Sequence, residues 1–172
     1  HCSVRRQRQM CIRDRIGVPK EIKPQENRIG LTPESVKDLI GNGHEVLVEK
    51  NGGYEAGFED KQYEDAGAKI VNRAEDIFND SEIIVKVKEP LANEVKMIRE
   101  DQIIFTYLHL AAAKDLTNGL IKSKGVCIAY ETVTDNNGRL PLLAPMSAVA
   151  GRMSVQAGAH CLEKNQKGRG VL

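Results

Sequence analysis

The chain has 172 residues, of which 41% are hydrophobic and 28% are charged, and its formal net charge is +1. These values are typical of a globular domain with a sizeable core, and they exclude a disordered chain. The near-neutral balance argues against a nucleic-acid partner. No apolar run reaches the roughly 18 residues of a membrane span, and no apolar stretch of a secretory signal follows the basic start. We therefore expect a cytoplasmic protein that does not act on a membrane.

Positive charge is concentrated at the beginning of the sequence. Residues 1–15 hold five arginines and one aspartate, a local charge of +4, without a helical or strand period. We expect this segment to be a non-native or disordered basic arm outside the fold. A nucleic-acid-binding arm is the alternative, and it is disfavoured because no aromatic side chain lies among the arginines.

The cysteines do not form a recognisable framework. There are four of them, none in a CxxC pair and none grouped with histidines at zinc-ligand spacing. Cys127 lies within an apolar strand pattern, which predicts a small core residue. We expect reduced thiols and no metal.

From residue 16 onward, strand-like and helix-like segments alternate. The first helix is the best marked, because Thr32 can cap it, Pro33 suits its first position, and Gly41 and Gly43 can end it. Pro90 and Gly67 end later segments in the same way. The expected strands span 15–19, 44–50, 69–71, 81–90, 102–110 and 126–133, and the expected helices span 32–43, 59–67, 74–80, 92–100, 114–125 and 146–164.

Strands separated by helices of this size predict βαβ units and a parallel sheet covered on both faces. The expected fold class is therefore α/β, a Rossmann-like or flavodoxin-like sheet. We expect a first domain over 16–146, which ends in a Gly/Pro/Asn-rich loop. Residues 147–172 are expected to be a connecting helix and the start of a further unit, so that the chain looks truncated.

Polar residues fall where the predicted strands end. Arg28 lies in the loop after the first strand, and Lys88, His109 and Glu131 lie at the ends of three others. Because ligands of open parallel sheets bind beyond the carboxyl ends of the strands, these four side chains are candidates for one site. Two cations and a histidine suit a small carboxylate substrate that gains or loses a proton.

Each of these residues also has an ordinary structural interpretation. An arginine in a loop is usually solvated, and a histidine after an apolar strand is often a satisfied core residue. Lys86 and Lys88 alternate on one face of a predicted strand, and a solvated residue at the sheet edge is the alternative interpretation of each. The sequence contains no G-x-G-x-x-G, no P-loop and no G-x-S-x-G, and "NGGYEAG" lacks the strand–turn–helix context of a phosphate cradle.

Several separated segments resemble the alanine dehydrogenase and pyridine-nucleotide transhydrogenase family, in the usual order and over residues 16–172. They include "IGVPKEIKPQENRIGLTPESV", "IIVKVKEP", "FTYLHLAA", "LPLLAPMSAVAGRMS" and "KGRGVL".

The resemblance implies an NAD-dependent enzyme that interconverts L-alanine with pyruvate and ammonia. It implies that His109 of "LHLAA" is the catalytic acid and base, and that Arg28 of "ENR" and Lys88 of "KVKEP" bind the substrate. It implies that Ser147 of "APMS" contacts the nucleotide and that Glu131 of "YET" lines the same cleft. Family members are much longer and form hexamers, so the nucleotide-binding domain is expected to be missing and this fragment to be inactive alone.

Three alternatives stay open at this point. The first is the nucleotide-binding part of a proton-translocating transhydrogenase, which generally lacks the histidine of "LHLAA". The second is a saccharopine dehydrogenase-like enzyme, which the "KVKEP" and "LHLAA" segments disfavour. The third is a non-catalytic module that binds small carboxylates.

Overall fold

The computed structural model describes residues 14–171, which form two compact units. The first unit ends at Ala129 and the second begins at Tyr130. This division differs from the predicted boundary at 146. After Ala129 no further strand follows within the described residues, and local backbone hydrogen bonds form, as between Val133 N and Tyr130 O.

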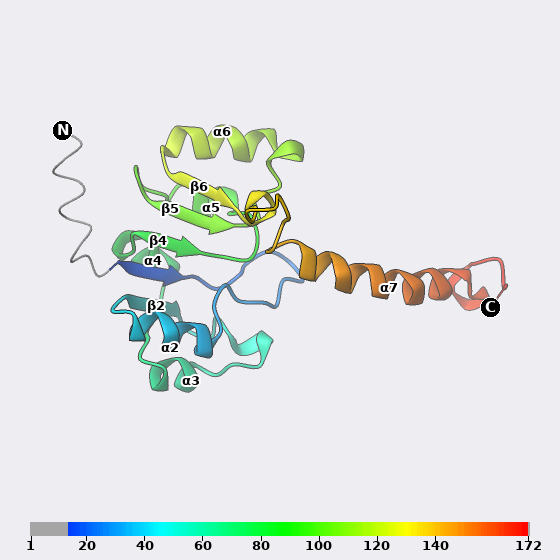
Figure 1. Cartoon of the computed structure of the whole chain (residues 1–172), viewed down its shortest axis with the longest axis horizontal. Helices are drawn as coiled ribbons and strands as arrows, with labels where there is room; N and C mark the ends of the chain where they lie inside the picture. The colour runs from blue at the N-terminus through cyan, green and yellow to red at the C-terminus, as the bar shows by residue number, and fades with distance from the viewer. Residues whose placement is uncertain (1–13, 172) are drawn as a thin grey trace. The chain divides into compact units, whose positions relative to one another are not determined.

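The first unit is built on a six-stranded sheet in the order β3-β2-β1-β4-β5-β6 (Figure 1). Every pair of neighbouring strands is parallel, which confirms the expected fold class. The order is that of a Rossmann-like sheet, with a reversal between β1 and β4. The strands are β1 (Arg15–Val18), β2 (Glu45–Glu49), β3 (Lys69–Val71), β4 (Ile83–Val85), β5 (Ile103–Thr106) and β6 (Val126–Ala129).

The helices of this unit fall where the sequence predicts them, and all but the helix at 74–80 are shorter than predicted. Thr32 caps the first of them, because its hydroxyl accepts a hydrogen bond from Ser35 N at 3.3 Å. At the start of the next helix, Gln62 Oε1 accepts a hydrogen bond from Glu59 N at 2.8 Å. The α-helices are α2 (Pro33–Gly41), α3 (Asp60–Asp65), α4 (Ala74–Asp80), α5 (Ala92–Val95) and α6 (Lys114–Ser123).

Two apolar cores lie on the two faces of the sheet, and β2 shows how one strand feeds both. Val46 and Val48 belong to the core under α2 and α3, whereas Leu47 belongs to the core under α4, α5 and α6. Tyr63 and Phe78 are the largest residues that are fully buried, one in each core. Cys127 packs against the second core, as predicted.

Three strands are much shorter than the sequence predicts. The predicted strand 81–90 is reduced to β4, 102–110 is reduced to β5, and 126–133 is reduced to β6. The apolar pattern continues past the ends of β4 and β5, and two backbone hydrogen bonds between them continue with it, from Lys86 N to Phe105 O at 3.1 Å and from Tyr107 N to Val87 O at 3.3 Å. Val87 N, by contrast, donates to the carboxylate of Glu21 at 2.6 Å and not to a neighbouring strand.

The start of the sheet corrects one expectation about residues 1–15. Residues 1–13 lie outside the described part of the chain, but Arg15 is the first residue of β1. Its backbone N donates to Glu82 Oε2 at 2.7 Å, and its guanidinium donates to Asp80 O at 2.9 Å. Arg15 therefore belongs to the fold and not to a basic arm.

The second unit consists of a loop, the helix α7 (Ala144–Leu162) and a 3-10 turn at Lys164–Gln166. The helix begins two residues before the expected 146–164. Residues 165–171 form the end of that turn and the loop after it. No helix within 14–171 is long and apolar enough to cross a membrane.

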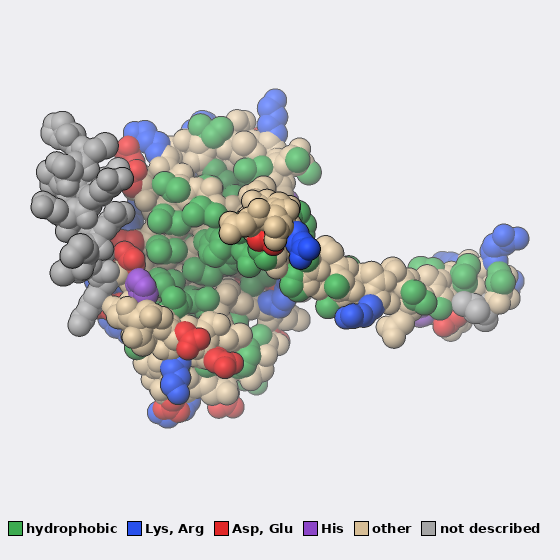
Figure 2. Space-filling view, in the orientation of Figure 1, with side chains coloured by type: hydrophobic (Ala, Val, Ile, Leu, Met, Phe, Trp, Pro, Cys, Tyr) green, Lys and Arg blue, Asp and Glu red, His purple; other side chains and the backbone are tan. Residues whose placement is uncertain are grey.

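Apolar side chains gather on the face of the molecule shown in Figure 2. At the edge of the sheet, Val126 and Ile128 of β6 are 46% and 40% exposed, whereas Cys127 and Ala129, which alternate with them, are partly buried. A surface of this kind favours association of the chain with itself or with other apolar surfaces.

Gly17 provides a test of how closely the first strand packs. A Cβ at this position would lie 2.5 Å from Ile77 Cγ2 and 2.5 Å from Ser81 Oγ, in the tightly packed second core. Gly17→Ala should therefore lower the free energy of unfolding, measured in urea, by about 1–3 kcal/mol. Gly41→Ala is the matched control, because a Cβ there meets nothing within 4 Å. The control should be neutral or stabilising by about 0.5–1 kcal/mol, and equal effects of the two changes would contradict the packing.

Candidate anion site at the reversal point of the sheet

The reversal between β1 and β4 places two loops side by side. Their strands are neighbours, with Ile16 opposite Ile83, and the chain leaves both strands at the same edge of the sheet. The connections then run in opposite directions, which opens a crevice where ligands of such sheets bind. Arg28 lies in the loop after β1, and Lys88 lies in the loop after β4.

The side chain of Glu21 ties these two loops together. Its Oε1 accepts hydrogen bonds from the backbone N of Val87 at 2.6 Å and of Lys88 at 3.2 Å. Glu21 is buried, so that the carboxylate replaces the sheet partner that these two amides lose beyond the end of β4. The backbone of Lys88 is also held from β5, because Thr106 Oγ1 donates to Lys88 O at 2.9 Å.

A buried cation completes this connection. Lys86 Nζ lies 3.2 Å from Glu21 Oε2 and 2.8 Å from Glu94 Oε1, and the three side chains are at most 3% exposed. Glu94 Oε2 accepts a hydrogen bond from Leu91 N at 2.8 Å. We call Glu21, Lys86 and Glu94 the buried triad; it joins the loop after β1, the loop after β4 and the start of α5.

Sequence reasoning missed the triad, because it treated Lys86 as a candidate for a solvated edge residue. The available signal was its position in the apolar run "IIVKV", since a lysine in a central parallel strand needs a buried partner. The partners themselves, Glu21 and Glu94, carry no local signal, because they are 65 and 8 residues away.

Arg28 is engaged by a neighbouring carboxylate. Its Nε and Nη2 donate to Glu26 Oε1 and Oε2 at 2.7 and 2.6 Å, and its backbone N donates to Glu26 Oε1 at 3.0 Å. The hydrogen bond from Arg28 lowers the pKa of Glu26 against the opposing effect of burial, and the charges of Arg28 and Lys88 lower it further. The hydrogen bond with Glu26 likewise raises the pKa of Arg28, and the interaction with the nearby Tyr107 adds a smaller rise.

His109 does not lie at the end of the strand, as predicted, but three residues beyond Thr106. Its backbone is left-handed, with φ 51° and ψ 37°, which is uncommon for a residue other than glycine. The side chain is exposed, and its ring stacks on Tyr107 with centroids 6.2 Å apart and an interplanar angle of 19°. The turn therefore presents the imidazole at the same edge of the sheet as the loop that carries Lys88.

Glu89 connects His109 electrostatically to the loop after β1. The Glu89 carboxylate pairs with the ammonium of Lys23. Partial burial is the largest single effect on the pKa of Glu89 and raises it, but the hydrogen bond from Lys23, a backbone hydrogen bond and the charges of Lys23 and His109 together lower the pKa. The three loops that follow β1, β4 and β5 thus carry Arg28, Lys88 and His109 to one edge of the first unit.

Glu131 and Ser147 belong to the second unit. Glu131 lies in a 3-10 turn over Tyr130–Thr132, and Ser147 lies in the first turn of α7, where its backbone N donates to Leu143 O at 3.1 Å. Their predicted roles, in the cleft and toward the nucleotide, stay predictions. Within 14–171, no group of three or more histidine, cysteine or acidic residues is arranged to hold a metal.

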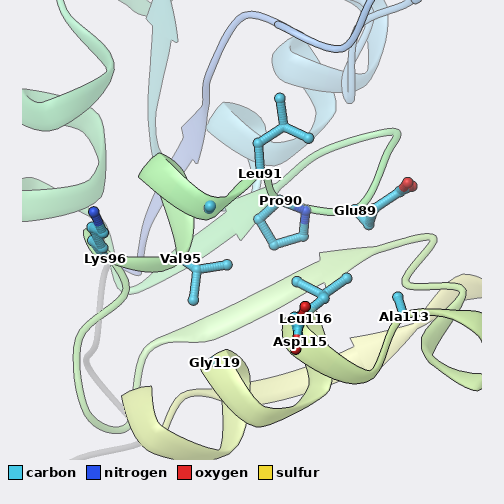
Figure 3. A pocket seen from close by; sticks show the side chains of 10 residues that line it. Glu89, Pro90, Leu91, Val95, Lys96, Ala113, Asp115, Leu116 and Gly119 are labelled. Atoms are coloured by element: carbon cyan, nitrogen blue, oxygen red, sulfur yellow. The ribbon is translucent and has the colours of Figure 1, made fainter.

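A separate apolar cavity of about 420 Å³ lies between α5 and α6. Its walls include Val95, Leu116 and the bare backbone of Gly119 (Figure 3). Glu89 stands at its rim, and Figure 3 shows its carboxylate pointing away from Val95 and Leu116. The cavity is therefore distinct in chemistry from the charged edge beside it.

The arrangement at the charged edge defines a class of protein. Arginine and lysine recognise carboxylates, and an exposed imidazole moves protons near neutral pH. The first unit is thus a Rossmann-like domain with a cationic edge suited to a small carboxylate.

Comparison with known sequences identifies the family. Residues 17–150 match the family described as "Alanine dehydrogenase/PNT, N-terminal domain", and the chain belongs to this family. It is 54% identical over 158 residues to alanine dehydrogenase of Halomonas elongata, covering 92% of this chain and 43% of the relative. It is also 54% identical to alanine dehydrogenase of Bacillus subtilis, covering 91% and 41%. The chain thus spans less than half the length of the relatives it matches.

Solved structures agree with this assignment. One described as L-alanine dehydrogenase superposes with a TM-score of 0.84 at 54% identity, covering 92% of this chain and 44% of the other. A transhydrogenase from Sinorhizobium meliloti superposes with a TM-score of 0.67 at 26% identity, covering 72% and 35%. The resemblance noted in the sequence is confirmed, and the dehydrogenase branch is the more similar of the two.

Lys86 tests the buried triad. Lys86→Met removes the only cation of the triad and leaves two buried carboxylates facing each other, so the free energy of unfolding at neutral pH should fall by about 3–5 kcal/mol. Lys61→Met, in the exposed pair of Lys61 with Asp65, is the matched control and should leave the unfolding free energy nearly unchanged. A loss at Lys86 no larger than at Lys61 would show that the triad is not buried.

The pairing of Glu26 with Arg28 can be tested by titration. Because its pKa is lowered in the folded protein, Glu26 stabilises the fold above the ordinary carboxyl pKa, and this contribution is lost as the pH falls through the lowered pKa. Arg28→Gln should raise the pKa of Glu26, since burial then acts with less opposition. Carboxyl-carbon NMR measures this directly, and an unchanged titration of Glu26 would contradict the pairing.

Proposed function

We propose that the full-length protein carrying this chain is an NAD-dependent L-alanine dehydrogenase, which converts L-alanine, NAD and water reversibly to pyruvate, ammonia and NADH. The observation that carries the proposal is the attachment of the Arg28 and Lys88 loops to each other through Glu21, beside the turn that bears His109. The 54% identity to proteins named alanine dehydrogenase supports it.

The proposed roles follow from the chemistry of each side chain. Arg28 binds the carboxylate of pyruvate or alanine with charge-assisted hydrogen bonds. Lys88 holds the carbonyl or amino end, so that the substrate α-carbon is fixed between the two cations. His109 takes and returns a proton at the substrate oxygen as water adds to the imine and as ammonia leaves.

The nicotinamide cofactor is proposed for the full-length protein. When bound, NAD accepts the hydride from the α-carbon. This chain does not contain the G-x-G-x-x-G turn that cradles a dinucleotide, and Ser147 is its one proposed contact with the nucleotide. One serine on α7 does not make a cradle, so no step in this chain is derived through the cofactor, and we expect these 172 residues alone to be inactive.

The assembly and location are proposals of the same kind. Resemblance to the family supports a homo-oligomer, a hexamer in the full-length protein, and a cytoplasmic location. The proposed partners are therefore small molecules, L-alanine and pyruvate, and not nucleic acid or a membrane.

A transhydrogenase subunit is the second candidate, favoured by the superposition on the Sinorhizobium meliloti protein. The lower identity of 26% counts against it. The histidine of "LHLAA" also counts against it, because the transhydrogenase branch generally lacks this residue.

The proposal is tested by His109→Gln in the full-length protein. This variant should lose alanine-dependent NADH formation, because glutamine cannot carry a proton, while NADH binding measured by fluorescence stays close to wild type. Arg28→Ala is the contrast, expected mainly to raise the KM for pyruvate through loss of an interaction of about 1.5–3 kcal/mol. Wild-type turnover in His109→Gln would refute the acid–base role, and an unchanged KM in Arg28→Ala would refute the carboxylate contact.

A further inference from the structure

The imidazole of His109 rests on the ring of Tyr107. The two rings are nearly parallel, with an interplanar angle of 19° and centroids 6.2 Å apart, which is the offset-stacked arrangement that aromatic pairs favour. Because the rings are stacked, the tyrosine covers a face of the imidazole and not its nitrogen edge. Proton transfer uses the ring nitrogens, so this contact can orient the imidazole without occupying the place of a substrate.

The fold holds these two residues to different degrees. His109 is exposed and lies in a turn, and an exposed side chain has several rotamers open to it. Tyr107 is only 6% exposed, and its neighbours Thr106 and Leu108 are buried as well. Tyr107 is therefore a fixed surface against which the more mobile imidazole can be placed.

The segment that bears Tyr107 is attached to the loop that carries Lys88. Tyr107 N donates a hydrogen bond to Val87 O at 3.3 Å, and Thr106 Oγ1 donates to Lys88 O at 2.9 Å. Both hydrogen bonds join the end of β5 to the residues that follow β4. An imidazole that rests on Tyr107 is thereby held in a set position relative to the backbone of Lys88.

Tyr107 also lies near the other cation that we assign to the substrate. The hydrogen bond with Glu26 is the largest effect on the pKa of Arg28, and Tyr107 adds a smaller rise. The tyrosine is thus in contact with His109 and within electrostatic reach of Arg28.

We propose that Tyr107 is a positioning residue for the acid–base step, because its ring fixes the rotamer and the plane of the His109 imidazole. The hydroxyl of Tyr107 takes no part in the proton transfer. This inference rests on the proposed function, since it takes His109 as the acid and base.

Two substitutions separate the ring of Tyr107 from its hydroxyl. Tyr107→Phe keeps an aromatic ring, whereas Tyr107→Leu introduces an apolar side chain that cannot stack. In the full-length protein, Tyr107→Leu should lower kcat for alanine oxidation by about 10- to 100-fold, the order of loss that a misplaced reacting group causes. Tyr107→Phe should keep kcat close to the wild-type value. Tyr54→Leu is the matched control, because Tyr54 is 64% exposed, and it should leave kcat unchanged.

Histidine NMR measures the stacking independently of catalysis. In full-length protein labelled with ¹³C at histidine Cε1, the His109 signal is assigned by its absence in His109→Gln. The ring current of Tyr107 should displace this signal from the position of a solvated histidine. The displacement should persist in Tyr107→Phe and disappear in Tyr107→Leu, and circular dichroism shows whether each variant is folded.

Each result bears on the inference. Loss of both kcat and the displaced signal in Tyr107→Leu, with both kept in Tyr107→Phe, supports it. Wild-type kcat in folded Tyr107→Leu overturns it, and so does an equal loss of kcat in Tyr107→Phe, which would assign the effect to the hydroxyl. An undisplaced His109 signal in the wild type also overturns it, whether or not the variants fold. Wild-type turnover in His109→Gln would instead count against the proposed function of His109 itself.

Discussion

The carboxylate of Glu21 is the constraint on which the candidate site depends. It accepts the backbone amides of Val87 and Lys88 where β4 has ended, and so fixes the loop after β1 to the loop after β4. Glu21 and Val87, on the two loops, are 66 residues apart in the sequence. Neither loop contains a helix: the first runs from β1 to α2, and the second runs from β4 to α5. Arg28 and Lys88 lie on these two loops, so Glu21 joins the segments that carry the two cations.

The cost of this arrangement is a buried charge cluster. A lysine enclosed by two carboxylates loses its hydration, and well-packed apolar residues would often serve stability equally well or better. Lys86 nevertheless gives Glu21 and Glu94 a common partner, and each of the two carboxylates also accepts a backbone amide. We infer that the cluster is retained for the geometry of the loops, since an uncharged side chain in place of Glu21 would hold the amides less strongly.

Much of the fold could be predicted, because its signals are local. The strand at 69–71 and the helix at 74–80 have the predicted bounds, since turn residues flank both. The positions of Lys88 and His109 were predicted at strand ends and lie in loops, because an apolar run does not show where ladder hydrogen bonds stop. Partners of buried charges, such as Glu94 for Lys86, depend on tertiary packing that no periodicity records. Glu26 and Arg28 are only two residues apart in the sequence, but the burial of the Glu26 side chain depends on the surrounding loops.

A crystal structure of the full-length protein with pyruvate bound would test the central claim most directly. The account predicts that the pyruvate carboxylate lies within hydrogen-bond distance of the Arg28 guanidinium. It also predicts that the pyruvate carbonyl faces Lys88 and His109, and that Glu21 still accepts the amides of Val87 and Lys88. Pyruvate bound away from Arg28, or bound there after the two loops have separated, would contradict the account.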